Sequence, residues 1–215
     1  MNSTWKDISI PITDKTLTWP TDPVFRINQF ASFTKGNPCD ASEISLSVHT
    51  GTHIDAPAHF INGGATTDHW KPEITIGPCR VVIIEDPKEI TEEELLKHKI
   101  QPNERIIFKT HNSDIRWWEK PFNPGFICIT PKAAALLAQL KPLCIGIDYL
   151  SVGSPDTGIE THQRLLGAGI WLIESLDLTE IRPGNYELIF MPMNLHYADG
   201  APGRAILKVN REQEQ

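Results

Sequence analysis

Apolar and polar positions alternate differently in the two parts of the chain, and the change falls near residue 79. Beyond it, short apolar runs that are typical of buried strands alternate with segments that carry helix-start signals. Strands are expected at Cys79–Glu85, Arg105–Thr110, Phe126–Ile129, Leu143–Ile147, Trp171–Leu176, Tyr186–Met191 and Arg204–Val209. Strands that alternate with helices in this order indicate α/β layering.

Three helices are expected between these strands. Thr91 opens the first, with Glu94 at the spacing of a capping box. Thr130 and Pro131 open the second as N-cap and first-turn proline. The third covers about Ile159 to Leu166 and is followed by glycines, which commonly end helices.

The first 78 residues show strand and turn signals with little helical periodicity. A β-rich N-terminal half is therefore expected to precede the alternating strands and helices. The sequence contains no repeat, low-complexity tract or linker, and 215 residues suit one domain with a substantial core. We expect residues 1–215 to form a single α/β domain.

Charge and composition narrow the choice of partners. The net charge of −7 offers no basic field for nucleic acid or anionic lipid. Apolar runs such as Ala133 to Ala138 are too short to span a bilayer, and the N-terminus MNSTWKDISIPITD lacks the pattern of an export signal. The four cysteines are widely spaced and form no CxxC pair. We expect a cytoplasmic protein with reduced, buried thiols and a small-molecule partner, and no nucleic-acid or membrane partner.

One segment combines regular alternation with two breaks. Ile44–Thr50 alternates as a half-buried strand does, which places His49 on its polar face. Gly51 then permits a tight turn, and Pro57 cannot donate to a strand ladder. We expect an irregular loop after His49, held between rigid points and able to bring several side chains together.

The side chains on this loop are those that bind metals. His49, His53, Asp55 and His59 follow within eleven residues, and four of the eight histidines lie between His49 and His69. Imidazole and carboxylate are common zinc ligands, and an open coordination position would make the site catalytic. The alternatives are histidines that only cap turns, or a closed structural site, which usually contains a cysteine that this segment lacks.

Two further positions stand out in the second half. Glu174 interrupts the apolar run WLIESL, where a carboxylate is costly to bury without a partner. His162, on the preceding helix, could reach the same end of the sheet. Asp148 ends the strand CIGID, where it either serves the site or caps a turn.

Several motifs together resemble a known family. The stretch HTGTHIDAPAH, His49 to His59, matches the HxGTHxDxPxH hallmark of the metal-dependent cyclase-type hydrolases, which include bacterial kynurenine formamidase and isatin hydrolase. TWP, GIDYLSV, YELIFMP and RAIL extend the likeness over nearly the whole chain. The resemblance implies a cyclase-like swivelling β/β/α fold and assembly as a homodimer or homotetramer.

The resemblance also implies a role for each matching residue. One or two divalent ions per subunit are expected, with Zn²⁺ or Mn²⁺ suited to these ligands. The expected metal ligands are His49, His53, Asp55, His162 and Glu174, with Asp55 bridging two ions, His59 as acid/base and Trp19 in an aromatic substrate pocket.

The implied reaction is hydrolysis of a small amide. An aryl formamide such as N-formylkynurenine, cleaved to kynurenine and formate, is the first substrate expected. Alternatives are an isatin-like cyclic amide, a lactone or an ester, or a metal-binding module without turnover. A serine hydrolase is disfavoured because no GxSxG elbow is present. Thr21, Asn194 and His196 depart from the formamidase pattern, so the resemblance gives them no role.

Overall fold

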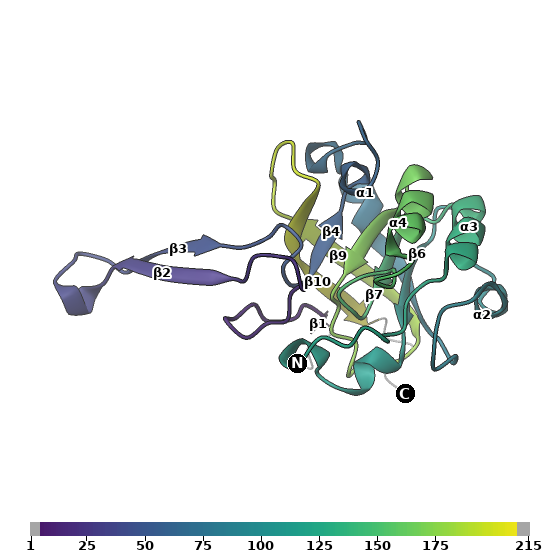
Figure 1. Ribbon diagram of the computed structural model, residues 1–215, viewed down its shortest axis with the longest axis horizontal. Helices are drawn as coiled ribbons and strands as arrows, with labels where there is room; N and C mark the ends of the chain where they lie inside the picture. The colour runs from purple at the N-terminus through teal and green to yellow at the C-terminus, as the bar shows by residue number, and fades with distance from the viewer. Residues whose placement is uncertain (1–4, 210–215) are drawn as a thin grey trace.

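The computed structural model describes residues 5–209 and places most strands in one sheet. Figure 1 shows this sheet at the centre of the body. Its eight strands are β1 (Trp5–Asp7), β4 (His53–Asp55), β5 (Ile76–Ile83), β6 (Arg105–Lys109), β7 (Cys144–Ile147), β8 (Trp171–Glu174), β9 (Gly184–Pro192) and β10 (Gly200–Val209).

The sheet closes on itself as a barrel. Its strand order is β1-β10-β4-β8-β7-β6-β5-β9, and β9 pairs back onto β10, so seven strands form a ring with β1 outside it. Strands β5 to β8 are parallel, whereas β4, β9 and β10 run antiparallel to their neighbours. Strand β4 therefore joins the antiparallel part of the ring to the parallel part.

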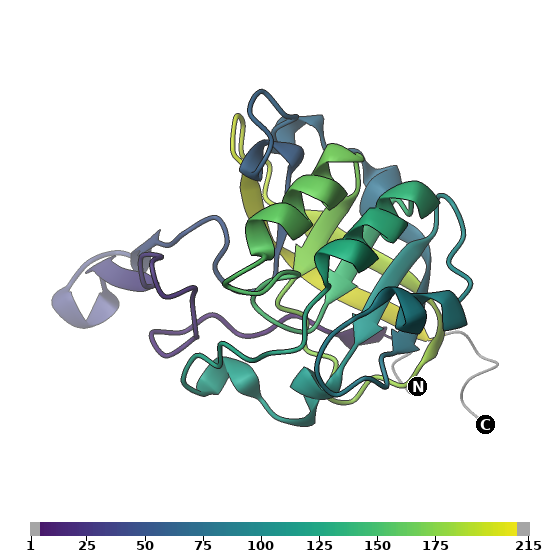
Figure 2. The ribbon, with the colours of Figure 1, turned by 45° about the vertical axis from the view of Figure 1, so that its right-hand side comes forward.

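Helices link the parallel strands, as the alternating pattern predicts. In Figure 2 α3 and α4 lie side by side over the sheet. One apolar cluster fills the space between helices and sheet, and a second lies between β4, β5, β9 and β10. The helices are α1 (Pro72–Thr75), α2 (Glu92–Lys97), α3 (Pro131–Leu140) and α4 (Gly158–Gly167). The α/β class and the β-rich N-terminal half are confirmed.

The helix starts agree with the sequence in part. The Thr91 hydroxyl accepts from Glu94 N and the Thr130 hydroxyl accepts from Ala133 N, as N-caps do. The expected return bond of a capping box is replaced, because the Glu94 carboxylate accepts from the backbone of Glu85 instead. The glutamate thus fastens α2 to the end of β5.

One predicted strand is wrong. Residues 126–129 are buried but irregular, with a single bridge from Ile129 to Ile90. The side chain of Asn112 binds both the N–H and the C=O of Ile127, so a side chain replaces the neighbouring strand. The other six predicted strands are present with shifted ends. Strand β8 stops early because Ser175 takes a left-handed conformation, φ 59°.

A long hairpin projects from the body, and we call residues 24–45 the arm (Figure 1). It consists of β2 (Arg26–Ala31) paired antiparallel with β3 (Ala41–Ser45), with a short 3-10 turn between them. The predicted strand over Ile44–Thr50 is therefore wrong beyond Ser45. Its apolar face is also not buried by the body, since the Ile44 side chain is 53% exposed.

Three of the four cysteines, Cys79, Cys128 and Cys144, are buried and free, as expected. Cys39 is exposed on the arm, which corrects the expectation that all four are buried. Within residues 5–209, no helix has the length and apolar character that crossing a bilayer demands.

Candidate metal centre

The strand register brings two distant carboxylates together. Within β4, His53 lies opposite Glu174 of β8, and Asp55 lies opposite Gly200 of β10. His53, Asp55 and Glu174 are all nearly fully buried. The loop expected after His49 thus contains a short strand that the sequence did not indicate, and this strand carries the centre of the site.

Turns on both sides of β4 supply the other two histidines. Gly51, with φ 71°, turns the chain between His49 and β4, as predicted. Pro57 opens a 3-10 turn, Pro57–His59, that ends on the second histidine. The rings of His49 and His59 stack with centroids 3.9 Å apart.

Backbone carbonyls fix the orientation of two imidazoles. His53 Nδ1 donates to Gly51 O at 2.8 Å, and His162 Nδ1 donates to Gly158 O at 2.6 Å. A ring that donates from Nδ1 presents the lone pair of Nε2 on its other side. Both Nε2 atoms face the carboxylates, which is the arrangement of metal-bound histidines.

The potential ligand atoms are closely spaced. Asp55 Oδ1 lies 2.9 Å from His49 Nδ1 and 3.3 Å from His53 Nε2. On the other side, His162 Nε2 lies 3.3 Å from Glu174 Oε1 and 3.7 Å from Asp55 Oδ2. Ligands of one tetrahedral zinc lie roughly 3.3 Å apart. Asp55 therefore offers one oxygen to each of two groups.

The cluster fits a metal because its buried atoms lack other partners. Among the described residues, neither His53 Nε2 nor Asp55 Oδ2 has a hydrogen-bond partner. His53 Nε2 lies 3.3 Å from Asp55 Oδ1, but this contact does not have the geometry of a hydrogen bond. Buried polar atoms without partners are rare and costly, and a cation between them would satisfy both.

The charges favour the same conclusion. Burial would raise the pKa of Asp55, but the hydrogen bond from His49 and the nearby His53 imidazole outweigh burial and hold it well below its usual range. Burial would lower the pKa of His53, but Asp55 and Glu174 outweigh burial and raise it to about 9. The carboxylates thus stay ionised and require positive charge beside them, which a proton or a divalent ion supplies.

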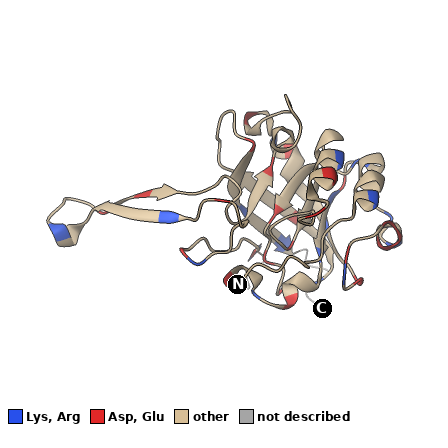
Figure 3. Ribbon diagram, viewed as in Figure 1, with Lys and Arg blue, Asp and Glu red and all other residues tan. Residues whose placement is uncertain are grey.

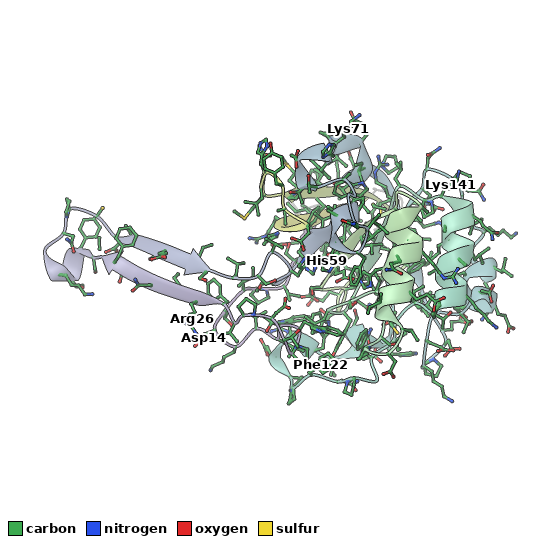
Figure 4. The ribbon with its side chains drawn as sticks, turned by 45° about the horizontal axis from the view of Figure 1, so that its top comes forward. Asp14, Arg26, His59, Lys71, Phe122 and Lys141 are labelled. Atoms are coloured by element: carbon green, nitrogen blue, oxygen red, sulfur yellow. The ribbon has the colours of Figure 1, made fainter. Side chains whose placement is uncertain are left out.

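His59 occupies a different position from the other histidines. Its Nδ1 lies 3.1 Å from Asp199 Oδ2, and burial lowers its pKa. A neutral imidazole is the form that accepts a proton. Figure 4 labels His59 on the body, and Arg26 where the arm begins.

A cavity of about 330 Å³ opens beside the cluster. This volume falls at the lower end of the range for ligand sites, roughly 300–1,000 Å³. Trp19 lines it and packs edge-on against Phe122, with centroids 5.3 Å apart. Lining residues that the sequence did not indicate include Phe60, Leu150 and Ile159.

The remaining candidates lie outside the cluster. Asp148 accepts hydrogen bonds from Thr110 and Ser113, so it fastens a turn, one of its two expected roles. Asn194 and His196 are exposed and do not line the cavity. Asp199 was missed, although it lies a few residues after Asn194 and His196, which depart from the formamidase pattern.

Comparison with known proteins agrees with the fold and the cluster. The Cyclase family model, described as "Putative cyclase", matches residues 6–154. Kynurenine formamidase of Bacillus cytotoxicus is 32% identical over 96% of this chain and 98% of its own, and that of Polaromonas naphthalenivorans is 33% identical over 94% and 89%. A solved structure described as a potential metal-dependent hydrolase with cyclase activity superposes with a TM-score of 0.82, at 32% identity and covering 94% of this chain and 96% of its own.

A more distant structure shares the fold alone. Isatin hydrolase A from Labrenzia aggregata has a TM-score of 0.81 at 22% identity, covering 95% of this chain and 93% of its own. The barrel and its cluster of histidines and carboxylates define an α/β protein whose side chains are arranged to bind a metal. The chain belongs to the cyclase family.

Proposed function

We propose that the protein is a metal-dependent amidohydrolase that cleaves an aryl formamide, with N-formylkynurenine as the first candidate. One observation carries the proposal: three imidazoles and two carboxylates converge beside a cavity with an aromatic wall, and two of their buried atoms, His53 Nε2 and Asp55 Oδ2, have no hydrogen-bond partner within residues 5–209. The kynurenine formamidase relatives, aligned over nearly the whole chain, support the choice of substrate.

In this proposal His49, His53, Asp55, His162 and Glu174 hold the metal. When bound, a divalent ion supplies water of lowered pKa and a positive charge for a carbonyl oxygen. Zinc suits these nitrogen and oxygen ligands, and manganese is the alternative. The two oxygens of Asp55 face opposite sides of the cluster, which supports two ions per chain.

His59 moves the proton in this proposal. Because Nδ1 faces Asp199, Nε2 is left to take a proton from water as its oxygen bonds to the formyl carbon. The same nitrogen returns that proton to the leaving amine as the C–N bond breaks. Water and the formamide thus become formate and an arylamine, and His59 ends as it began.

The cavity wall supports an aromatic substrate. Trp19 and Phe60 lie on it, and aromatic side chains favour offset or edge contacts with a ring. His59 and Glu174 line the same cavity, so a ring held by the wall has its substituent near the cluster.

The test is to load purified protein with Zn²⁺ or Mn²⁺, measure metal per chain, and assay three substrates. Metal-dependent release of formate from N-formylkynurenine, faster than opening of isatin or of a simple lactone, is expected. Faster isatin opening would replace the aryl formamide with a cyclic amide. Metal uptake without turnover of any of the three would instead identify a metal-binding module.

We also propose that the protein assembles as a homodimer or homotetramer through the arm. Val24, Ile27, Phe30, Phe33 and Ile44 are each more than half exposed, and Figure 3 shows few charged residues along the arm. A two-stranded hairpin alone is marginally stable in water, so its apolar side chains need a surface to pack on. Closed symmetric assembly of identical chains is the commonest way to supply one.

The proposed location is the cytoplasm. Three buried cysteines and one exposed cysteine are all free, which suits a reducing compartment.

A further inference from the structure

Asp199 contacts two histidines with a single oxygen. Its Oδ2 lies 3.0 Å from His49 Nε2 and 3.1 Å from His59 Nδ1. His49 belongs to the proposed metal set, whereas His59 is the proposed acid/base. The two rings stack, and this carboxylate lies at the edge of both.

The backbone around Asp199 is fixed from several sides. Ala56 N donates to Asp199 O, and Thr67 N donates to the carbonyl of Ala198. A Cβ atom on Gly200 would lie 2.6 Å from His49 Cε1, so only glycine lets the ring lie against β10. The chain is thus built to place this carboxylate beside the two rings.

The hydrogen bonds determine which nitrogens remain free. His49 lies between two carboxylates, with Nε2 3.0 Å from Asp199 Oδ2 and Nδ1 2.9 Å from Asp55 Oδ1; a proton that Asp199 holds on Nε2 would leave Nδ1 as the nitrogen able to bind a metal. His59 donates from Nδ1, which leaves Nε2 as the proton acceptor. If either ring flipped about its Cβ–Cγ bond, a ring carbon would face Asp199 and the hydrogen bond would be lost.

We propose that Asp199 is a positioning residue that holds a metal ligand and the acid/base together, setting the orientation of both imidazoles through one oxygen. This inference rests on the proposed function for the role of His59. Loss of such an outer carboxylate typically weakens metal affinity or activity about 10- to 100-fold. Asp199 is expected to affect both quantities at once.

The test compares Asp199→Ala with Asp68→Ala. Asp68 accepts from Tyr197 N and so fastens the same loop, but it contacts neither His49 nor His59. Zinc affinity of metal-free protein is measured by competition with a chelating dye, and kcat and KM are measured at saturating zinc. Asp199→Ala is expected to lower affinity and kcat about 10- to 100-fold each with KM nearly unchanged, whereas Asp68→Ala stays within about threefold.

A third variant, His59→Ala with Asp199→Ala, separates the two effects. In the His59→Ala background the second substitution should still weaken zinc binding but lower kcat no further, because the two residues act as one unit on the proton. Asp199→Asn should show smaller losses of both zinc affinity and kcat than Asp199→Ala.

The inference would be overturned if Asp199→Ala kept wild-type zinc affinity or wild-type kcat. It would also be overturned if Asp68→Ala lost as much as Asp199→Ala, or if the kcat losses of His59→Ala and Asp199→Ala added up in the double variant. Failure of the proposed function has a different signature. Wild-type protein would then show no turnover, while the zinc measurement would still test the contact with His49.

Discussion

Residues 24–45 and residues 49–59 are neighbours in the sequence and opposites in their surroundings. The arm carries apolar side chains in solvent, with Phe30 65% exposed. The following segment carries His53 and Asp55 at 1% exposure, buried on the side of β4 where His162 of α4 lies. Each segment departs from the usual distribution of side chains, in which apolar groups are buried and charged groups are exposed unless paired.

The two departures have different physical causes. Burying carboxylates costs free energy unless a cation and hydrogen-bond partners compensate their charge. The cluster therefore indicates a bound metal ion. Exposed apolar side chains on a hairpin are stabilised when another surface buries them, and only a large surface can cover the whole hairpin. The arm therefore indicates a macromolecular partner. We therefore expect that either region can be disrupted without altering the other.

The largest effect is expected from Asp55→Ala. The substitution removes the carboxylate shared by both ligand groups, so metal per chain should fall and turnover should drop more than about a thousandfold. Asp55→Asn, which keeps the shape, should lose metal too. Metal analysis and kcat check this, with Asp68→Asn as the control. Full metal content in Asp55→Asn would refute the ligand assignment.

His59→Ala should remove the proton carrier and leave the metal. A positioned acid/base contributes about 10²- to 10⁴-fold, so kcat should fall by that factor with wild-type metal content. The decisive comparison is metal content against kcat in one preparation. Full activity in His59→Ala would show that another group moves the proton, and loss of metal would make His59 a ligand.

The sequence indicated four members of the cluster directly because these four are local. His49, His53, Asp55 and His59 fall within eleven residues, and their chemistry is recognisable before any fold is known. Asp199 could not be found in this way, because it lies 140 residues from His59 and reaches it only through the pairing of β10 with β4. No local pattern encodes that register.

The arm shows a different limit of sequence reasoning. Period-two alternation around Ile44 correctly indicates one apolar face, and Ile44 does pair across the hairpin with Ile27. The pattern does not say what covers that face. The same limit explains residues 126–129, whose apolar run is buried as expected but pairs the backbone of Ile127 with the Asn112 side chain in place of a neighbouring strand.

Removal of metal should destabilise the body. A ligand at a hundred times its dissociation constant stabilises the folded state by about 2.7 kcal/mol. For a chain of this size that corresponds to a fall in Tm of roughly 5–10 °C on chelation. Thermal unfolding with and without chelator checks this, and Asp55→Asn should no longer respond. An unchanged wild-type Tm would count against metal at the buried carboxylates.

Ile27→Asp combined with Phe30→Asp should disrupt assembly while the cluster still binds metal. Buried aromatic and aliphatic anchors at interfaces contribute about 2 kcal/mol or more, so association should weaken at least about thirtyfold. Light scattering coupled to size exclusion measures the mass. Leu96→Asp on α2 is the matched control, since Leu96 is as exposed (65%) and lies on the body. An unchanged oligomer would remove the arm from the interface.

The smallest effect is expected at Trp19, which adjoins both regions. It lines the cavity beside His59 and precedes the arm by a few residues. Trp19→Ala should remove an aromatic contact worth about 0.5–1.5 kcal/mol, raising KM for N-formylkynurenine roughly two- to thirteenfold with kcat nearly constant. Trp5→Ala, on β1 outside the ring, should leave KM unchanged. If Ile27→Asp combined with Phe30→Asp raised KM as Trp19→Ala does, the arm would act on the cavity and the two regions would not be independent. If it changed mass alone, each region would have its own function.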